Sequence, residues 1–135
     1  MQRTAVIRKI YRDFAAGDAA PILGTFADDV EFRLAEGHPY RGRDGAWLGK
    51  QEITEKFFAV AGPEWDRWSI AIDQILEADD AVIVEGRYGG TYKPTGNAMH
   101  AQVCHVWRFR GSEVASFHQY VDTAALRRVM GRSGV

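Results

Sequence analysis

The stretch "AQVCHVWRFRGSEVASFHQYVDT", from Ala101 to Thr123, reads as two β-strands folded about Gly111 and Ser112. Apolar and polar residues alternate on both sides of this turn, which is typical of strands with one face in the core. The residues that share a face with His105 are apolar: Ala101, Val103, Trp107 and Phe109. The hairpin therefore predicts that His105 points toward the interior of the fold.

The register of this hairpin decides which residue lies opposite His105. A two-residue type II′ turn at Gly111 and Ser112 would place His118 there. A three-residue loop or a β-bulge would place Gln119 there instead, because a slip of one residue exchanges the two faces of a strand. The two alternative inward sets are His118, Tyr120 and Asp122, or Phe117, Gln119 and Val121. The second set is favoured because it contains the apolar pair of this strand.

The spacing of apolar residues predicts the remaining elements. Helical spacing indicates helices over residues 4–16, 19–27 and about 50–61, and a short C-terminal helix after an Asp122 N-cap. Alternation indicates strands over residues 30–34, 68–76 and 81–92. The third helix is expected to bury Ile53, Phe57 and Val60. The strand over residues 68–76 is expected to place on one face Trp68, Ile70, Ile72 and Leu76.

Three helices followed by long antiparallel strands predict an α+β fold. We expect a curved, cone-shaped antiparallel sheet that wraps over the three helices of the N-terminal half and encloses a pocket, with a short C-terminal helix. The length of 135 residues predicts a single domain, residues 1–135, since a chain of this size buries roughly two-thirds of its unfolded surface. Glu36 and His38, in the loop after the first strand, are expected near the mouth of the cone.

The charge balance excludes some classes of partner. The chain carries 17 basic and 18 acidic residues, a formal net charge of -1, which favours neither nucleic acid nor an anionic membrane as a partner. Cys104 is the only cysteine, so the sequence predicts no internal disulfide and no cysteine-based zinc site. His100 and Cys104 fall on the face opposite His105, and no metal site is expected. The charged N-terminus, "MQRTAVIRKIYRDF", does not resemble a signal peptide, so a cytoplasmic protein is expected.

Three stretches of the sequence resemble a known superfamily. They are "FAAGDAAPILGTFADDVEF", "LGKQEITEKFF" and "PTGNAMHAQVCHVWRFRGSEVASFHQYVDTAAL". Together they are similar to the cone-shaped α+β superfamily of nuclear transport factor two, ketosteroid isomerase and the SnoaL-like polyketide cyclases. The last block most closely resembles the ketosteroid isomerase-related branch. The resemblance implies the cone fold, whereas the reaction differs from member to member of such a superfold.

The resemblance assigns roles residue by residue. Ketosteroid isomerases use an aspartate base with a tyrosine and a protonated aspartic acid as the oxyanion hole. Matching those patterns puts Leu34 at the base, Ile10 at the tyrosine with Tyr11 one residue further, and His105 at the protonated acid. The cyclase pattern has a histidine at His105 and an acid/base aspartate where this chain has Gln119. Because glutamine has no titratable proton, the resemblance implies neither mechanism unchanged.

The catalytic candidates are His105 and Gln119. The candidate ligand-binding residues are Tyr11, Phe14, Leu34, Trp47, Phe57, Tyr88, Val103 and Trp107. A buried, neutral His105 is suited to general-base chemistry, with Gln119, Tyr88 and Tyr11 orienting a substrate or holding an oxyanion. The alternative is a core histidine whose nitrogens are satisfied by Tyr88, Gln119 or a backbone carbonyl.

The sequence thus predicts a pocket for a small hydrophobic molecule that bears a carbonyl group or a ring, with no metal or organic cofactor. With His105 as the proton-transfer group, the chemistry would be isomerisation, cyclisation or hydrolysis. The alternative function is a non-catalytic ligand-binding or dimeric interaction module. The superfamily resemblance also implies a homodimer formed through the sheet, and the strand residues on its outer face are His100, Gln102, Cys104, Val106 and Arg108.

Overall fold

The structure is a computed structural model that describes residues 3–18, 20–41 and 45–132. Ala19, in the expected second helix, and residues 42–44, in the loop after the first strand, lie outside the described residues. The helices are α1 (Arg3–Ala15), α2 (Ala20–Thr25), α3 (Lys50–Ile53), α4 (Ala59–Ala61) and α5 (Thr123–Val129). The strands are β1 (Phe26–Arg33), β2 (Ala46–Leu48), β3 (Trp65–Glu77), β4 (Ala81–Tyr92), β5 (Asn97–Arg110) and β6 (Glu113–Val121).

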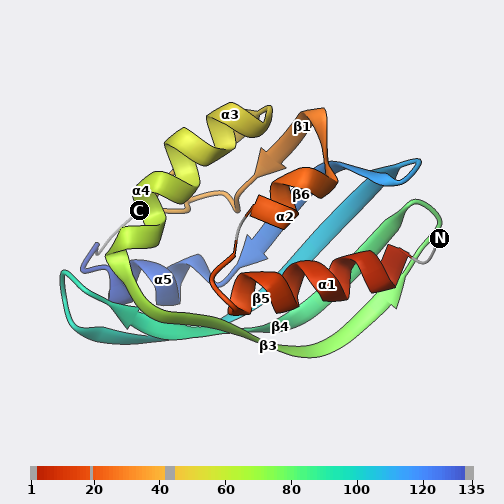
Figure 1. The fold of residues 1–135 in the computed structure, drawn as a ribbon. Coiled ribbons are helices and arrows are strands. Elements are labelled where there is room, and N and C mark those ends of the chain that lie inside the picture. The colour runs from red at the N-terminus through yellow and green to blue at the C-terminus, as the bar shows by residue number, and fades with distance from the viewer. Residues whose placement is uncertain (1–2, 19, 42–44, 133–135) are drawn as a thin grey trace.

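The six strands form one sheet in the order β2-β1-β6-β5-β4-β3. Neighbouring strands are antiparallel except β1 and β6, which are parallel. Figure 1 shows the long strands curving beneath α1, with α2 and the α3–α4 helix on the same, concave side. The predicted α+β architecture of a curved sheet over N-terminal-half helices, with a short C-terminal helix, is confirmed.

The first strand begins earlier than its sequence pattern suggests. The structure ends α2 at Thr25 and starts β1 at Phe26, whereas a helix to residue 27 and a strand from residue 30 were expected. A register shift between Phe26 and Glu31 leaves Asp28 and Asp29 exposed while the apolar residues around them are buried. The two aspartates therefore form an irregularity inside the strand and do not end the helix. The short edge strand β2 was not expected at all.

The predicted helix over residues 50–61 contains a π-helical turn, η1 (Thr54–Phe58), and continues into a 3₁₀ turn, η2 (Gly62–Glu64). The π turn holds more residues than an α turn and rotates everything that follows it. Ile53 is buried and Phe57 half-buried, as expected, and Phe58 joins them against the core. The prediction that Val60 is buried is wrong, since that side chain is 52% exposed.

A similar irregularity changes the inner face of β3. Its pairing with β4 shifts between Ile72 and Gln74, where one extra residue interrupts the alternation. Ile75 therefore packs against the core, and Leu76, expected on the inner face, is 42% exposed. Trp68 and Ile70 precede the shift and face inward as expected.

The hairpin of β5 and β6 has the two-residue turn of one predicted register and the His105–Gln119 pairing of the other. Arg110 pairs with Glu113 across a two-residue turn, and a register shift two residues later leaves Ala115 as an extra residue on β6. Beyond this bulge His105 lies opposite Gln119, as favoured from the apolar pattern. Asp122 caps α5, because its side chain accepts a hydrogen bond from the Ala125 backbone N–H at 3.1 Å.

Candidate functional site

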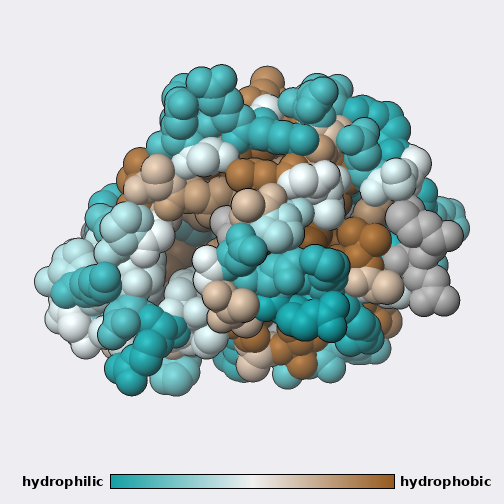
Figure 2. All heavy atoms as spheres, in the orientation of Figure 1, coloured by the Kyte–Doolittle hydropathy of each residue, from teal (hydrophilic) through white to brown (hydrophobic). Residues whose placement is uncertain are grey.

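A cavity of about 640 Å³ opens between the helices and the concave face of the sheet. Its lining combines residues of the two apolar clusters of the core, one around α1, β1 and Trp107, the other around α5 and the first half of β5. Figure 2 shows the surface hollowed on this side, with hydrophobic side chains in the recess between α4 and α1. A volume of this size and a mainly apolar lining are typical of sites for small organic molecules.

The structure brings most of the predicted site residues to this cavity. Those on its lining are Tyr11, Phe14, Phe57, Tyr88, His105, Trp107 and Gln119. Leu34, Trp47 and Val103 do not line it, contrary to expectation. Leu34 and Trp47 belong to the first buried cluster, where Trp47 packs behind Phe32 and Phe57, and Val103 belongs to the second. These three residues fill the core beside the cavity.

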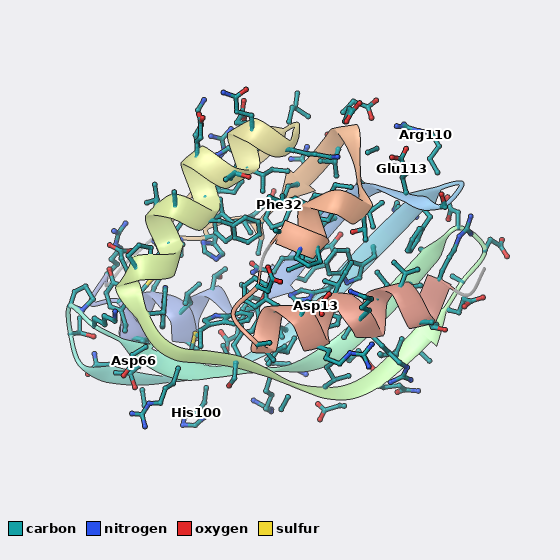
Figure 3. All side chains as sticks on the ribbon, viewed as in Figure 1. Asp13, Phe32, Asp66, His100, Arg110 and Glu113 are labelled. Carbon is teal, nitrogen blue, oxygen red and sulfur yellow. The ribbon has the colours of Figure 1, made fainter. Side chains whose placement is uncertain are left out.

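Other lining residues were not among the candidate site residues, although His38 was expected near the mouth of the cone. Phe32, Phe117 and Phe58 supply rings to the wall, and His38 and Tyr40 reach it from the loop after β1. Figure 3 shows Phe32 pointing into the space between the sheet and the α3–α4 helix. Alternation along β1 and β6 placed Phe32 and Phe117 on the inner faces, so the signal was present. No comparable pattern exists for a loop residue such as His38.

His105 lies between two tyrosine hydroxyls. It comes from the middle of β5, and only 4% of its surface is exposed. The Tyr11 hydroxyl, from α1, lies 2.5 Å from Nδ1, and the Tyr88 hydroxyl, from β4, lies 2.6 Å from Nε2. The two ring nitrogens of His105 therefore both hydrogen-bond to tyrosine side chains that line the cavity.

A second layer of donors fixes the tyrosines. The Trp107 indole N–H donates to the Tyr11 hydroxyl at 2.9 Å, and the Gln119 amide N–H donates to the Tyr88 hydroxyl at 2.9 Å. Gln119 is buried, and its Oε1 is the one fully enclosed side-chain nitrogen or oxygen atom among the described residues that has no hydrogen-bond partner. An enclosed acceptor without a donor is costly to maintain, so it requires an explanation.

Burial keeps every member of this group neutral. Loss of contact with water lowers the pKa of His105 to about 3. The same loss raises the pKa of Tyr11 and of Tyr88 well above the usual tyrosine range. Desolvation disfavours the charged form in each case, so imidazolium and tyrosinate are both unfavourable here.

A count of protons shows what the group offers to a ligand. Neutral His105 and the two tyrosines carry three polar hydrogens, but only two of them are needed for the two tyrosine–histidine bonds. With the histidine proton on Nε2, the Tyr88 proton is left over. With it on Nδ1, the Tyr11 proton is left over. One hydroxyl donor is therefore always available, and the histidine tautomer decides which one.

The described residues contain no group of three or more histidine, cysteine, aspartate or glutamate side chains that is suited to a metal ion. Figure 3 shows His100 pointing away from the concave side of the sheet, which agrees with its expected outer position. None of the helices in the described ranges is long and apolar enough to cross a membrane.

The chain is similar in sequence to one family and in structure to several proteins. The family model of the SnoaL-like domain matches residues 7–117. An NTF2-like protein from Burkholderia thailandensis is 29% identical, with a TM-score of 0.87 over 96% of this chain and 98% of that chain. An NTF2-like protein of unknown function from Burkholderia pseudomallei is 25% identical, with a TM-score of 0.86 and the same coverage, 96% and 98%.

A third solved structure was obtained with a small molecule. TerC, co-crystallized with polyporic acid, is 26% identical, with a TM-score of 0.84 over 96% of this chain and 98% of that chain. Among curated proteins, none matches the sequence. The family match spans most of the chain, and the solved structures share its curved sheet and its helices. The chain therefore belongs to the SnoaL-like domain family and has the NTF2-like cone fold.

Proposed function

We propose that this protein binds a flat aromatic molecule that carries a carbonyl group beside a hydroxyl group, and that it catalyses proton transfer on that molecule without a metal or organic cofactor. The ring-lined cavity of about 640 Å³ suits a ligand of this size and polarity. TerC, at 26% identity, was co-crystallized with polyporic acid. Polyporic acid is a hydroxyquinone, in which hydroxyl groups lie beside carbonyl groups.

The observation that carries the proposal is a donor and an acceptor left without partners in the same corner of the cavity. The leftover tyrosine proton is a donor, and Gln119 Oε1 is an enclosed acceptor. A carbonyl oxygen of the ligand accepts from the first, and a hydroxyl group of the ligand donates to the second once the Gln119 side chain turns its amide oxygen toward the cavity. A hydroxy-carbonyl ligand therefore satisfies both, which a ligand with a carbonyl alone does not.

The same group moves a proton without forming a charge. Starting from the Nε2–H tautomer, the Tyr88 proton passes to an atom of the ligand while His105 returns its proton to the Tyr88 oxygen. In the same concerted step the Tyr11 proton passes to Nδ1, and Tyr11 takes a proton from a second atom of the ligand. The ligand is isomerised, the protein differs only in its histidine tautomer, and no buried imidazolium or tyrosinate appears. Positioned proton transfer of this kind contributes about 10²- to 10⁴-fold in rate.

One observation favours the alternative of binding without chemistry. General acids and bases work best when their pKa lies near the working pH. Burial lowers the pKa of His105 to about 3, far from neutrality. In this alternative the same donor and acceptor hold the ligand, and the histidine only orients the two hydroxyl groups.

Exchange of a carbon-bound hydrogen distinguishes the two functions. The probe is 2-hydroxy-1,4-naphthoquinone, a flat hydroxy-carbonyl compound, incubated with the protein in D₂O and followed by proton NMR. We expect loss of its ring hydrogen beside the hydroxyl group to be faster with the protein. Tyr88→Phe should lose this acceleration. Tyr92→Phe, a buried tyrosine that does not line the cavity, is the matched control and should keep it. Binding by calorimetry without faster exchange would favour the binding module, and absence of binding would overturn both.

The outer face of the sheet supports an additional proposal, that two copies pair through it. Tyr120 lies opposite Cys104 on β5 and is 51% exposed. His118 stacks on Tyr120 at 4.1 Å and lies opposite Val106. This continuous mixed patch on the central strands supports the dimer expected from the superfamily resemblance.

A further inference from the structure

His38 is a second buried histidine on the wall of the cavity. It lies in the loop between β1 and β2, and 4% of its surface is exposed. Its Nδ1 accepts a hydrogen bond from the Tyr40 backbone N–H at 3.2 Å. Burial lowers its pKa to about 4, so the ring is neutral near pH 7. A neutral ring that accepts at Nδ1 carries its proton on Nε2, and His38 is therefore a donor with a fixed tautomer.

That donor has no hydrogen-bond partner within the part of the chain that the structure describes. Tyr40, two residues further along the loop, is nevertheless anchored by hydrogen bonds to residues outside the loop. The Tyr40 hydroxyl donates to Glu64 Oε1 at 2.5 Å and accepts from the Trp65 indole N–H at 2.8 Å. These contacts tie the loop to the start of β3. His38 is thus fixed in place before any ligand arrives, which lowers the entropic cost of using it as a contact.

His38 and His105 reach the cavity lining from different elements, the loop after β1 and the strand β5. The hydrogen-bond partners of His105 are Tyr11 and Tyr88, and those of the His38 side chain come from its own loop. A row of lining rings connects the two, with centroid separations of 4.8, 4.5, 5.3, 6.2 and 5.7 Å. The row runs His105, Phe117, Phe32, Phe57, Tyr40, His38. The wall between the two histidines is therefore aromatic.

We propose that His38 is a second ligand contact, and that its Nε2–H donates a hydrogen bond to an oxygen at the far end of an elongated aromatic ligand. The inference rests on the proposed function, because it concerns the same cavity, and adds to it the shape of the ligand. One oxygenated end meets Tyr11, Tyr88 and Gln119. The apolar rings lie along the aromatic row, and the second oxygen reaches His38. A ligand with oxygen at one end only would leave the His38 donor without a partner.

A pair of biphenyl probes tests this arrangement by titration calorimetry. The first, 4-phenylphenol, has oxygen at one end, and the second, 4-acetyl-4′-hydroxybiphenyl, has oxygen at both. The second probe should bind about 5- to 10-fold more tightly, the effect of one additional buried hydrogen bond. His38→Phe keeps a ring but removes the donor, and it should abolish this difference while leaving 4-phenylphenol unchanged. His38→Gln places an amide N–H near the position of Nε2, and it should restore much of the difference.

Nuclear magnetic resonance of the unaltered protein supplies a measurement that needs no variant. The ¹⁵N signals of His38 should show the Nε2–H tautomer, and Nε2 should shift with the acetyl probe and not with 4-phenylphenol. Equal affinities for the two probes, or a His38→Phe variant that weakens both equally, would overturn the inference and leave the proposed function standing. If neither biphenyl binds while 2-hydroxy-1,4-naphthoquinone does, the inference is overturned and the proposed function stands. If none of the three compounds binds, both are contradicted. An Nδ1–H tautomer would overturn the inference alone.

Discussion

His105 and Gln119 lie directly opposite one another in the β5–β6 pair, yet their side chains meet through a third group, the hydroxyl of Tyr88. Tyr88 lies on the neighbouring strand β4 and receives the Gln119 amide N–H on one side and faces Nε2 of His105 on the other. Three strands thus contribute one side chain each to a single hydrogen-bonded group. The proposed function therefore depends on this group of three side chains and not on His105 alone.

Loss of the Tyr88 hydroxyl should therefore affect both stability and binding. Tyr88→Phe leaves the Gln119 amide and one nitrogen of His105 enclosed without their partner, which costs about 1–3 kcal/mol of unfolding free energy. The affinity for 2-hydroxy-1,4-naphthoquinone should fall about 10-fold or more. Denaturant unfolding and calorimetry measure the two effects. Tyr92→Phe should change neither by a comparable amount, and equal losses in the two variants would argue against a specific role for Tyr88.

Acid should destabilise the fold through its two buried, neutral histidines. Burial lowers the pKa of His105 to about 3 and that of His38 to about 4, from 6.5 for exposed histidine. At pH values between the folded-state pKa and 6.5, the unfolded chain binds more protons than the folded one. The free energy of unfolding therefore decreases as the pH falls from about 6.5 toward 4. Each residue contributes a slope of up to about 1.4 kcal/mol per pH unit.

Urea unfolding at a series of pH values checks this expectation. His38→Gln should reduce the slope between pH 6 and 5 by about the share of one histidine. His100→Gln, which replaces an exposed histidine on the outer face, should keep the slope of the unaltered protein. Identical pH profiles for all three proteins would show that His38 is not held neutral in the folded state.

Gly86 should be intolerant of a side chain. A Cβ atom at this position would lie 2.4 Å from the backbone oxygen of Ala71 on β3, where the two strands approach closely. Gly86→Ala should cost about 1–3 kcal/mol, because the neighbouring backbone must move. Gly24→Ala is the control, since a Cβ there meets nothing within 4 Å and alanine favours the helix. Similar denaturation midpoints for the two variants would contradict the close approach.

The proposed dimer predicts a species of twice the 15.1 kDa mass of the chain. Val106→Arg places a charge in the centre of the outer patch and should shift sedimentation toward the single chain. Leu48→Arg, at an exposed position on the edge strand β2, should leave the assembly unchanged. Sedimentation of the unaltered protein as a single chain at micromolar concentration would refute the dimer.

The spacing of apolar residues predicted the inward-facing side chains well where the backbone is regular. It predicted them poorly where a bulge or a π-helical turn adds one residue to the element. The inner face of β4 follows simple alternation and was anticipated, as were Trp68 and Ile70 on the inner face of β3. Val60 and Leu76 were misplaced because a π turn and a bulge precede them. Such insertions depend on tertiary pairing and leave little trace in local sequence.

The residues of the candidate site likewise fall into those that strand alternation predicts and those that it does not. His105 and Gln119 were found because strand alternation and the family resemblance agreed on them. Tyr11 was expected to orient a substrate or hold an oxyanion, although the resemblance placed Ile10 at the equivalent position. In the structure both residues line the cavity. His38 carries no periodic signal, because its orientation comes from a hydrogen bond within a loop.

Because Ala115 forms a bulge, the number of residues between the turn and Gln119 does not by itself decide which side chains of β6 face inward. The paired residues near the turn and the paired residues beside His105 are offset by Ala115, which has no partner on β5. Removing Ala115 would leave Gln119 opposite His105. A residue added between Ala115 and Gln119 would instead place the imidazole of His118 there, and a residue removed from that stretch would place the phenol of Tyr120 there. The side chain that faces His105 is thus insensitive to loss of the bulge residue and sensitive to any change in length between the bulge and Gln119.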